Sequence, residues 1–152
     1  MDWTTFLIQL VTAFLGALGF AILFQVNRNL LFWASAGGFL VWLVYLLCGS
    51  FTGSDVLKSF LASIVVTFYA EIMARWKKTP AVVFLAPGTI PLMPGGFLYQ
   101  TMEYAFNGEW ENAFFQGLHT LLLAAAISGG ILMTMTFWGI TEKLIRKMSR
   151  PA

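Results

Sequence analysis

The groups best suited to bind a solute in this sequence are backbone groups, in a proline- and glycine-rich stretch from Pro87 to Gly96. Each proline removes a backbone N–H and the glycines add flexibility, so the chain is expected to unwind there. The surrounding run from Pro80 to Met102 carries no charge and is long enough to enter a membrane. Irregular backbone at that depth is buried in protein or lines a wet cavity. Its amide and carbonyl groups can then bind a small carboxylate or zwitterion.

Within this stretch the residues assigned to a solute pathway are Pro87, Gly88, Thr89, Pro91, Pro94 and Gly95. A helix that restarts near Gly95 would direct its N-terminal dipole at an anionic group. The alternative is a re-entrant turn that only shapes the fold.

Three ionisable side chains are candidates for proton coupling: Glu71, Glu103 and His119. Ionisable residues in membrane spans are costly, and histidine changes its charge near neutral pH, so each is a functional candidate. Each also has a structural interpretation. Glu71 can pair with Arg75 four positions on. Glu103 can be a solvated carboxylate, and His119 can be a hydrogen-bonded residue near the membrane interface.

Motifs of enzyme catalysis are absent from the sequence. It contains no Ser/His/Asp order with supporting motifs, no HExxH, no Walker loop and no cysteine cluster. His119 is the sole histidine and has no partners at metal-ligand spacing. We therefore expect no catalytic residue, no metal and no cofactor.

The composition indicates an integral membrane protein. Of 152 residues, 59% are hydrophobic, 16% are aromatic and 11% are charged, whereas soluble domains carry roughly 25% charged residues. The mean hydropathy is +0.77. No linker or low-complexity segment divides the chain, so we expect one transmembrane domain over residues 1–152.

Five membrane segments of an all-α protein account for the apolar runs. The predicted spans are Trp3–Val26, Leu30–Gly49, Val56–Trp76, the broken segment Pro80–Asn107, and Asn112–Thr141. The first run is too long for the apolar core of a signal peptide and lacks a basic residue before it. The last is long enough to tilt or to project beyond the bilayer.

The basic residues predict the orientation of these spans. They follow the first, third and fifth spans, as Arg28, then Arg75, Lys77 and Lys78, then Lys143, Arg146, Lys147 and Arg150. The opposite side carries Asp2, Asp55, Glu103, Glu109 and Glu111, with Lys58 as its one basic residue. By the positive-inside tendency the N-terminus is outside and the C-terminus is cytoplasmic, as in a multi-pass protein of the plasma membrane.

Tryptophans are expected to mark the two interfaces. Trp3 and Trp110 fall at the outer one, and Trp33, Trp76 and Trp138 lie near the inner one. Trp42 is mid-span, so we expect it to pack against a neighbouring side chain.

Small residues predict close helix contacts. The candidates are Gly16 and Gly19 in the first span, Gly37 and Gly38 in the second, and Ala125, Gly129 and Gly130 in the fifth. Small residues four positions apart let helix backbones approach closely. Ordinary membrane composition is the alternative explanation.

The run Pro87-Gly88-Thr89-Ile90-Pro91-Leu92-Met93-Pro94-Gly95, followed by Tyr99, resembles the PG-x-x-PLVPG…Y signature of the threonine/serine exporter family, in its smaller C-terminal half. The run Gly19–Phe24 with Arg28 is similar to the first helix of that half and its basic loop. Pro80-Ala81 after a basic turn is similar as well. Met93 stands where valine is usual, and Val26-Asn27 replaces a loop that often contains proline. The resemblance adds Tyr99 to the solute pathway.

The resemblance implies export of small amino acids such as threonine and serine, or of dicarboxylates such as succinate in related two-gene systems. In fused members a longer half with its own spans precedes this one. The chain therefore resembles one subunit of a split exporter, with a partner subunit like that larger half, and forms a hetero- or homo-oligomer. Inverted halves around a midplane site suit alternating access. A self-assembling channel or a scaffold for another membrane protein is the alternative.

Overall fold

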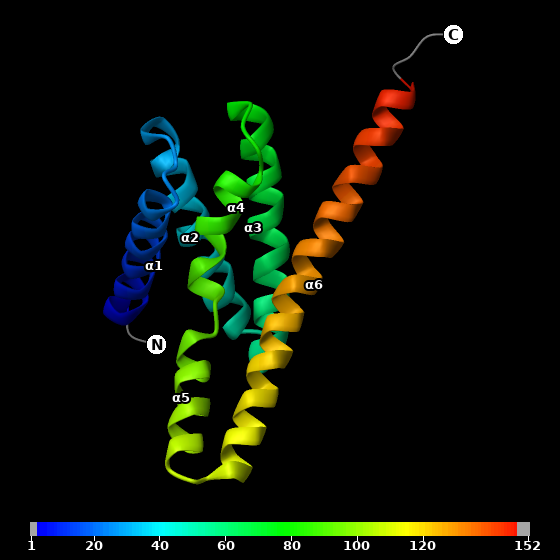
Figure 1. The fold of residues 1–152 in the computed structure, drawn as a ribbon. Coiled ribbons are helices and arrows are strands. Elements are labelled where there is room, and N and C mark those ends of the chain that lie inside the picture. Colours follow the sequence, from blue (N-terminus) through cyan, green and yellow to red (C-terminus); the bar gives the residue numbers. More distant parts are fainter. Residues whose placement is uncertain (1–2, 149–152) are drawn as a thin grey trace.

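A computed structural model describes residues 3–148, with side chains described over residues 3–141. Over this range the chain is helical throughout and has no strand. The elements are α1 (Trp3–Leu23), α2 (Arg28–Gly49), α3 (Asp55–Lys77), α4 (Val82–Thr89), the 3₁₀ helix η1 (Ile90–Leu92), α5 (Gly95–Phe106) and α6 (Trp110–Met148) (Figure 1). The predicted spans thus agree with the observed helices to within a few residues, except that α6 extends to Met148.

Three helices end in the same local geometry. Gln25, Lys78 and Gly108 have positive φ angles of 55°, 53° and 78°. In each case the following N–H donates to the carbonyl five residues back, as Val26 N does to Ala21 O at 3.0 Å. This left-handed cap satisfies carbonyls at the end of the helix and turns the chain sharply. Only Gly108 adopts the conformation without steric cost.

Helix α2 is the centre of a bundle and packs against α1, α3 and α4. Two glycines permit the close approach. A Cβ on Gly38 would overlap the Cβ of Ala17 and lie 3.2 Å from the Ala13 carbonyl oxygen. A Cβ on Gly37 would lie 3.4 Å from the Cα of Gly88 in α4. The expected contact of the second span at these glycines is therefore present within the chain.

Helix α6 packs against α3 over the middle of its length. A Cβ on Gly130 would overlap Ser63 Oγ and lie 2.8 Å from the Phe60 carbonyl oxygen. Closer to the C-terminal end, the Arg75 guanidinium lies 4.5 Å from the centre of the Trp138 ring.

The remaining small residues make no such contact within the chain. A Cβ on Gly16 or Gly19 would meet nothing within 4 Å, and one on Gly129 would only touch Phe60 at 3.9 Å. Ala125 is exposed. Any close packing of these residues would require another molecule.

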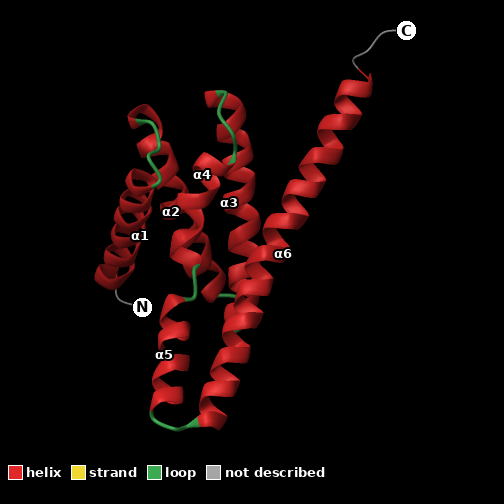
Figure 2. Ribbon diagram, in the orientation of Figure 1, coloured by secondary structure: helices red, strands yellow, loops and turns green. Residues whose placement is uncertain are grey.

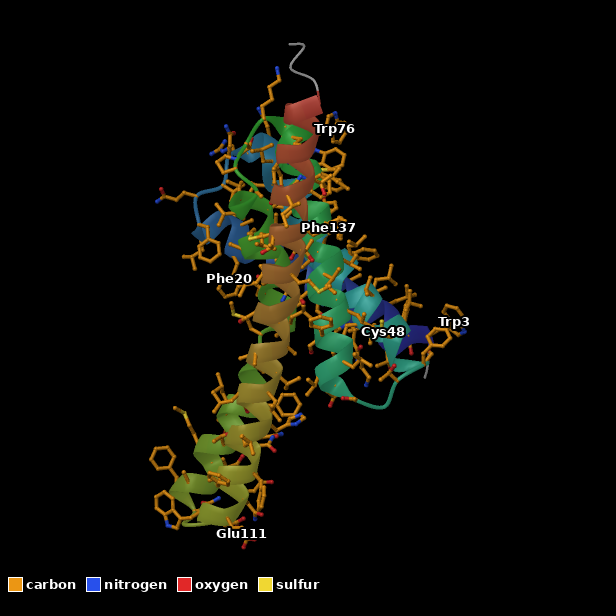
Figure 3. All side chains as sticks on the ribbon, turned by 90° about the vertical axis from the view of Figure 1, so that its right-hand side faces the viewer. Trp3, Phe20, Cys48, Trp76, Glu111 and Phe137 are labelled. Atoms are coloured by element: carbon orange, nitrogen blue, oxygen red, sulfur yellow. The ribbon has the colours of Figure 1, made fainter. Side chains whose placement is uncertain are left out.

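The N-terminal part of α6 and helix α5 form a hairpin that stands apart from the bundle. Helix α5 has no buried residue and packs mainly against α6. Figure 3 shows Glu111 at the far tip of this hairpin, well beyond the level of Trp3 and Cys48. The assignment of Trp3 and Trp110 to one outer interface stays a prediction, because their helices reach different levels of the molecule. Hydropathy identified both segments as apolar, but it contains no information on their relative height.

The loops after α1 and α3 lie at the same end of the molecule (Figure 2). Arg28, Arg75, Lys77 and Lys78 therefore gather at this end, which we call the basic end. Here Trp33 and Trp76 pack edge to face at 5.0 Å, with Lys77 Nζ 4.7 Å and 4.3 Å from their ring centres. The side chains of Lys143, Arg146 and Lys147, and Asp2 and Arg150 entirely, lie outside the described residues.

Four helices, α1, α2, α3 and α6 up to Thr141, are long and apolar enough to cross a membrane. The segments Val82–Leu92 and Gly95–Phe106 would make a fifth span, bent by 48°. The described residues thus form an all-helical protein with four or five candidate membrane spans.

Candidate functional site

The break in the fourth segment is short and falls at Met93 and Pro94. Proline disfavours the α conformation for the residue before it, and Met93 is extended, with φ −62° and ψ 125°. The expectation that the whole stretch from Pro87 unwinds is wrong. Pro87 lies within α4, and Pro91 lies at the start of η1, where its missing N–H is tolerated.

A cavity of about 210 Å³ opens beside this break. Its walls come from α2, α3, η1, α5 and α6, and the lining residues are Trp42, Tyr45, Ser59, Pro91, Leu92, Met93, Pro94, Gly96, Phe97, Gln100 and Leu123. This volume is below the roughly 300–1,000 Å³ of clefts that hold drug-sized ligands. The cavity therefore suits a smaller solute.

Two residues of the first turn of α5 line the cavity. Gly96 and Phe97 lie in this turn, where amide N–H groups have no intrahelical acceptor. No side chain caps the helix, because its N-cap residue is Pro94. The positive end of the α5 dipole thus faces the space beside the break.

Trp42 forms part of the α2 wall and stacks on Tyr45. The two rings lie 5.0 Å apart with an interplanar angle of 16°, which confirms that the mid-span tryptophan packs against a neighbour. The indole Nε1 of Trp42 is buried and has no hydrogen-bond partner among the described residues.

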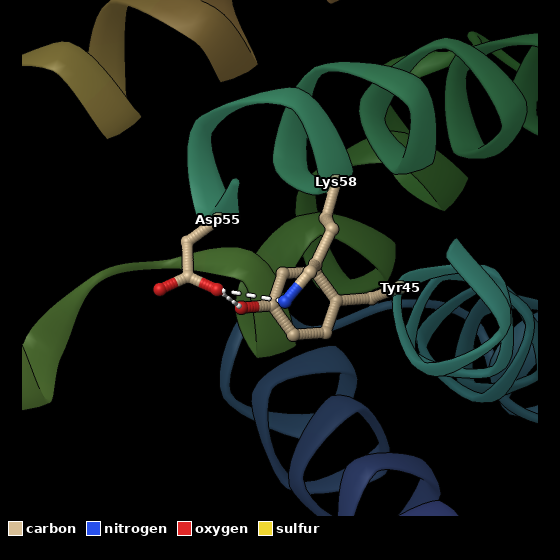
Figure 4. A network of polar contacts seen from close by, with 3 residues as sticks. All are labelled: Tyr45, Asp55 and Lys58. Carbon is tan, nitrogen blue, oxygen red and sulfur yellow. Dashed lines mark hydrogen bonds and ion pairs between the residues drawn. The ribbon is translucent and has the colours of Figure 1, made fainter. Parts of the chain in front are cut away.

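An ion pair sits next to the cavity at Tyr45 (Figure 4). Lys58 Nζ lies 3.0 Å from Asp55 Oδ1, and the Tyr45 hydroxyl donates to the same oxygen at 3.3 Å. The Lys58 side chain is 16% exposed and that of Asp55 is 37% exposed. Lys58 also lies 5.7 Å from the centre of the Tyr45 ring. The one basic residue that departs from the positive-inside pattern is thus held beside the cavity.

The α5–α6 hairpin contributes further polar side chains close to the cavity. Gln116 Nε2 donates to Gln100 Oε1 at 2.7 Å. The His119 ring packs edge to face on Phe97, with ring centres 5.2 Å apart. The structure therefore places His119 against Phe97, one of the residues that line the cavity.

The first half of the predicted pathway is packed in the core. Pro87 and Gly88 are buried, and Thr89 donates its hydroxyl to the Ala86 carbonyl at 3.1 Å. A Cβ on Gly88 would lie 2.9 Å from Val66 Cγ2. These residues join α4 to α2 and α3, whereas Pro91 and Pro94 line the cavity.

The other predicted site residues lie away from the cavity walls. Gly95 is exposed with open space around it, and Tyr99 is 69% exposed. Glu103 is exposed on α5. Glu71 lies about 18 Å along α3 from Ser59 and pairs with Arg75, whose Nη1 is 3.2 Å from Glu71 Oε2. The intrahelical pairing expected for Glu71 is therefore present.

Sequence reasoning did not identify the cavity residues on α2 and α3. Two signals could have found them: Trp42 did not fit an interface position, and Lys58 was the exception among the basic residues. Tyr45 and Ser59 look like ordinary span residues in the sequence, and only the tertiary contact shows their place.

A helical chain with several membrane-length apolar helices, a bent segment and a small cavity of mixed polar and apolar lining at its break has an architecture that multi-pass membrane transporters use. The model of the family described as Threonine/Serine exporter, ThrE, matches residues 9–137, so the chain belongs to this family. The family is one of exporters and not of enzymes, which supports a transporter-type role. Comparisons with curated proteins and with solved structures found no match.

Proposed function

We propose that this chain exports small carboxylate-bearing solutes, threonine and serine or a dicarboxylate such as succinate, through the cavity at the Met93–Pro94 break. The observation that carries the proposal is the meeting of five elements around one small cavity at the broken segment. Its wall combines a free helix N-terminus with indole, hydroxyl and amide groups. Such groups bind a carboxylate and leave apolar contacts for the rest of the solute.

An alternating-access cycle is supported by a second cavity on the other side of the segment. This cavity, of about 400 Å³, is lined by residues of the α1–α2 loop, the α3–α4 loop and α4, including Gln25, Asn27, Thr79 and Pro87. Between the two cavities the chain passes through the buried residues Gly88 and Thr89. A small movement of Gly88 and Thr89 would change which of the two cavities the solute can enter.

The proposed orientation places the basic end in the cytoplasm and the hairpin tip outside, in the plasma membrane. Four described basic residues at one end support it, because cytoplasmic loops are enriched in lysine and arginine. A reporter fused after Ala152 should read cytoplasmic and one inserted near Glu109 should read external. Equal signals at both places would reject an odd number of spans between Glu109 and Ala152.

A partner subunit like the larger half of the family is proposed to complete the transporter. The support is that α5 buries no residue of its own, although Tyr99, Met102 and Phe106 expose 69%, 62% and 90% of their surfaces. Co-expression with a candidate partner and co-purification in detergent test this proposal. A chain that transports fully as a monomer in liposomes would contradict it.

Proton coupling is proposed for His119, with Glu71 and Glu103 as the other candidates. His119 is supported by its contact with Phe97, which lines the cavity. Neutralising the coupling residue, as in His119→Gln, should abolish dependence on the pH gradient more than it weakens solute binding.

The test of the proposed site is the double variant Pro91→Ala/Pro94→Ala. It restores two backbone donors and favours a continuous helix through the break. Efflux of labelled threonine or succinate should fall severely while the protein still inserts at the normal level. Pro80→Ala is the matched control, because Pro80 is exposed and does not line the cavity. Normal efflux from the double variant at matched expression would remove the cavity from the transport path.

A further inference from the structure

An apolar groove lies between α3 and α6, in the half of the bundle nearer to the basic end. Toward its C-terminal end α6 leans away from α3 (Figure 1), and a groove of about 610 Å³ opens between the two helices. Its lining residues are Ile64, Phe68, Leu132, Met133, Thr134, Thr136, Phe137 and Ile140. Thr134 and Thr136 donate their hydroxyls to carbonyls of their own helix at 2.9 Å and 2.7 Å. The lining therefore presents hydrocarbon surface to an occupant.

The groove has the length of the acyl chains in one leaflet of a bilayer. Leu132 and Ile140 are its first and last residues on α6, and eight helical steps span about 12 Å. The hydrocarbon core is about 30 Å thick, so one leaflet contributes about 15 Å. Leu132, Met133, Phe137 and Ile140 are each more than half exposed. Figure 3 shows Phe137 and Trp76 on the same side of α6, with Trp76 nearer to the basic end.

Positive charge stands at the end of the groove. Phe68, in its wall, packs edge to face on Trp138 with ring centres 5.6 Å apart, and the Arg75 guanidinium lies 4.5 Å from the centre of the Trp138 ring. Glu71 pairs with Arg75, but arginine has five N–H donors and can bind a phosphate as well as a carboxylate. Two lysines follow Arg75 at the end of α3, so this end stays positively charged despite Glu71.

We propose that this groove binds an anionic phospholipid of the surrounding bilayer, with an acyl chain between α3 and α6 and the phosphate at Arg75. A hydrocarbon-lined groove that leads to a cationic end matches an amphiphile with an apolar chain and an anionic head. Basic sites between membrane helices bind anionic headgroups in this way. An apolar helix of another chain would fit the groove but would gain nothing from the positive charge at its end. The inference does not depend on the transported solute.

The first test measures lipid binding to the full chain by native mass spectrometry in detergent. Phosphatidylglycerol and phosphatidylcholine with the same acyl chains are titrated separately. The anionic lipid should bind at least about fivefold more tightly, the factor that one basic residue near a membrane surface contributes. Equal affinity for the two lipids would overturn the inference. Displacement of phosphatidylglycerol by glycerol 3-phosphate would also overturn it, because that anion lacks the chain that the groove holds.

The second test separates the two parts of the site with variants. Arg75→Gln removes the cation and should weaken phosphatidylglycerol binding about fivefold. Arg28→Gln is its matched control, because Arg28 is an exposed cation of the same basic end but begins α2. Phe137→Ala removes part of the groove wall and should weaken binding roughly fivefold through lost carbon contacts. Phe115→Ala is its matched control, because both rings are 62% exposed on α6 and Phe115 does not line the groove.

Both controls should bind phosphatidylglycerol within about twofold of the wild type. Equal loss in Arg75→Gln and Arg28→Gln, or in Phe137→Ala and Phe115→Ala, would overturn the proposed site. A lipid-free dimer that Phe137→Ala dissociates would assign the groove to a second copy of the chain instead. If Arg75→Gln does not fold, Glu71→Gln gives the decisive result. It removes the carboxylate that competes for Arg75 and should tighten phosphatidylglycerol binding, whereas unchanged or weaker binding would contradict a phosphate at this place.

Discussion

The two halves of the proline- and glycine-rich stretch have similar compositions and opposite surroundings. Pro87, Gly88 and Thr89 are buried between α2, α3 and α4, whereas Pro94, Gly95 and Gly96 lie at the start of an exposed helix beside a cavity. In the first half the glycine lets two backbones approach. In the second half the glycines leave open space beside the backbone. The same residue types thus serve packing in one place and access in the other, and only the neighbours distinguish the two.

The largest effect is expected from Gly88→Leu. A Cβ there would lie 2.9 Å from Val66 Cγ2 and 3.6 Å from the backbone of Gly37, so the longer side chain must separate α4 from the bundle. We expect a loss of about 3 kcal/mol, at the upper end of the cost of overpacking, measured by thermal unfolding in detergent. Gly95→Leu is the matched control, because a Cβ on Gly95 meets nothing within 4 Å. This control should melt near the wild-type temperature, and equal melting of both variants would contradict the distinction between the halves.

An effect of comparable size is expected at one of two neighbouring glycines on α6. Gly130→Leu should disrupt packing on Ser63 and Phe60 of α3 and cost about 1–3 kcal/mol. Gly129→Leu should leave the unfolding free energy nearly unchanged, since its nearest contact is a ring atom at 3.9 Å. If Gly129 contacts a second molecule, its variant should instead weaken association, measured by light scattering in detergent. Loss of stability in Gly129→Leu alone would contradict the observed helix register.

The smallest stability effect is expected from Asp55→Asn beside the cavity. The partly exposed Asp55–Lys58 pair should contribute less than about 1 kcal/mol, and added salt should reduce that contribution further. Because the substitution frees Lys58 next to the solute site, transport should change more than the melting temperature does. A large stability loss with unchanged transport would make the pair a structural element only.

Much of the helical frame was predictable because it follows from local chemistry. The ends of α2 and α3 fall within two residues of the predicted bounds, since charged and turn-forming residues border apolar runs there. The position of the break was predicted less well. Several prolines were candidates, and the preference of Met93 for an extended conformation before Pro94 decided among them.

The composition of the site was the least predictable part. Pro91 and Pro94 were identified from the sequence, but Trp42, Tyr45 and Ser59 reach the cavity from helices far away in the chain. Sequence periodicity describes the faces of one helix and does not define which faces meet. The height of the α5–α6 hairpin is unpredictable for the same reason, because it depends on the register of Gly130 against Phe60 and Ser63.

The length of α6 gives this register a mechanical consequence. From Gly130 to Trp110 the helix runs without interruption, so the contact with α3 can act as a fulcrum and the hairpin as the long arm of a lever. At 1.5 Å per residue that arm is about 30 Å, and a tilt of about 10° would carry its tip by about 5 Å. Leu123, on the cavity wall and closer to the fulcrum, would move by only about 2 Å under the same tilt. A force on the hairpin tip would therefore reach the cavity wall as a smaller displacement with greater mechanical advantage.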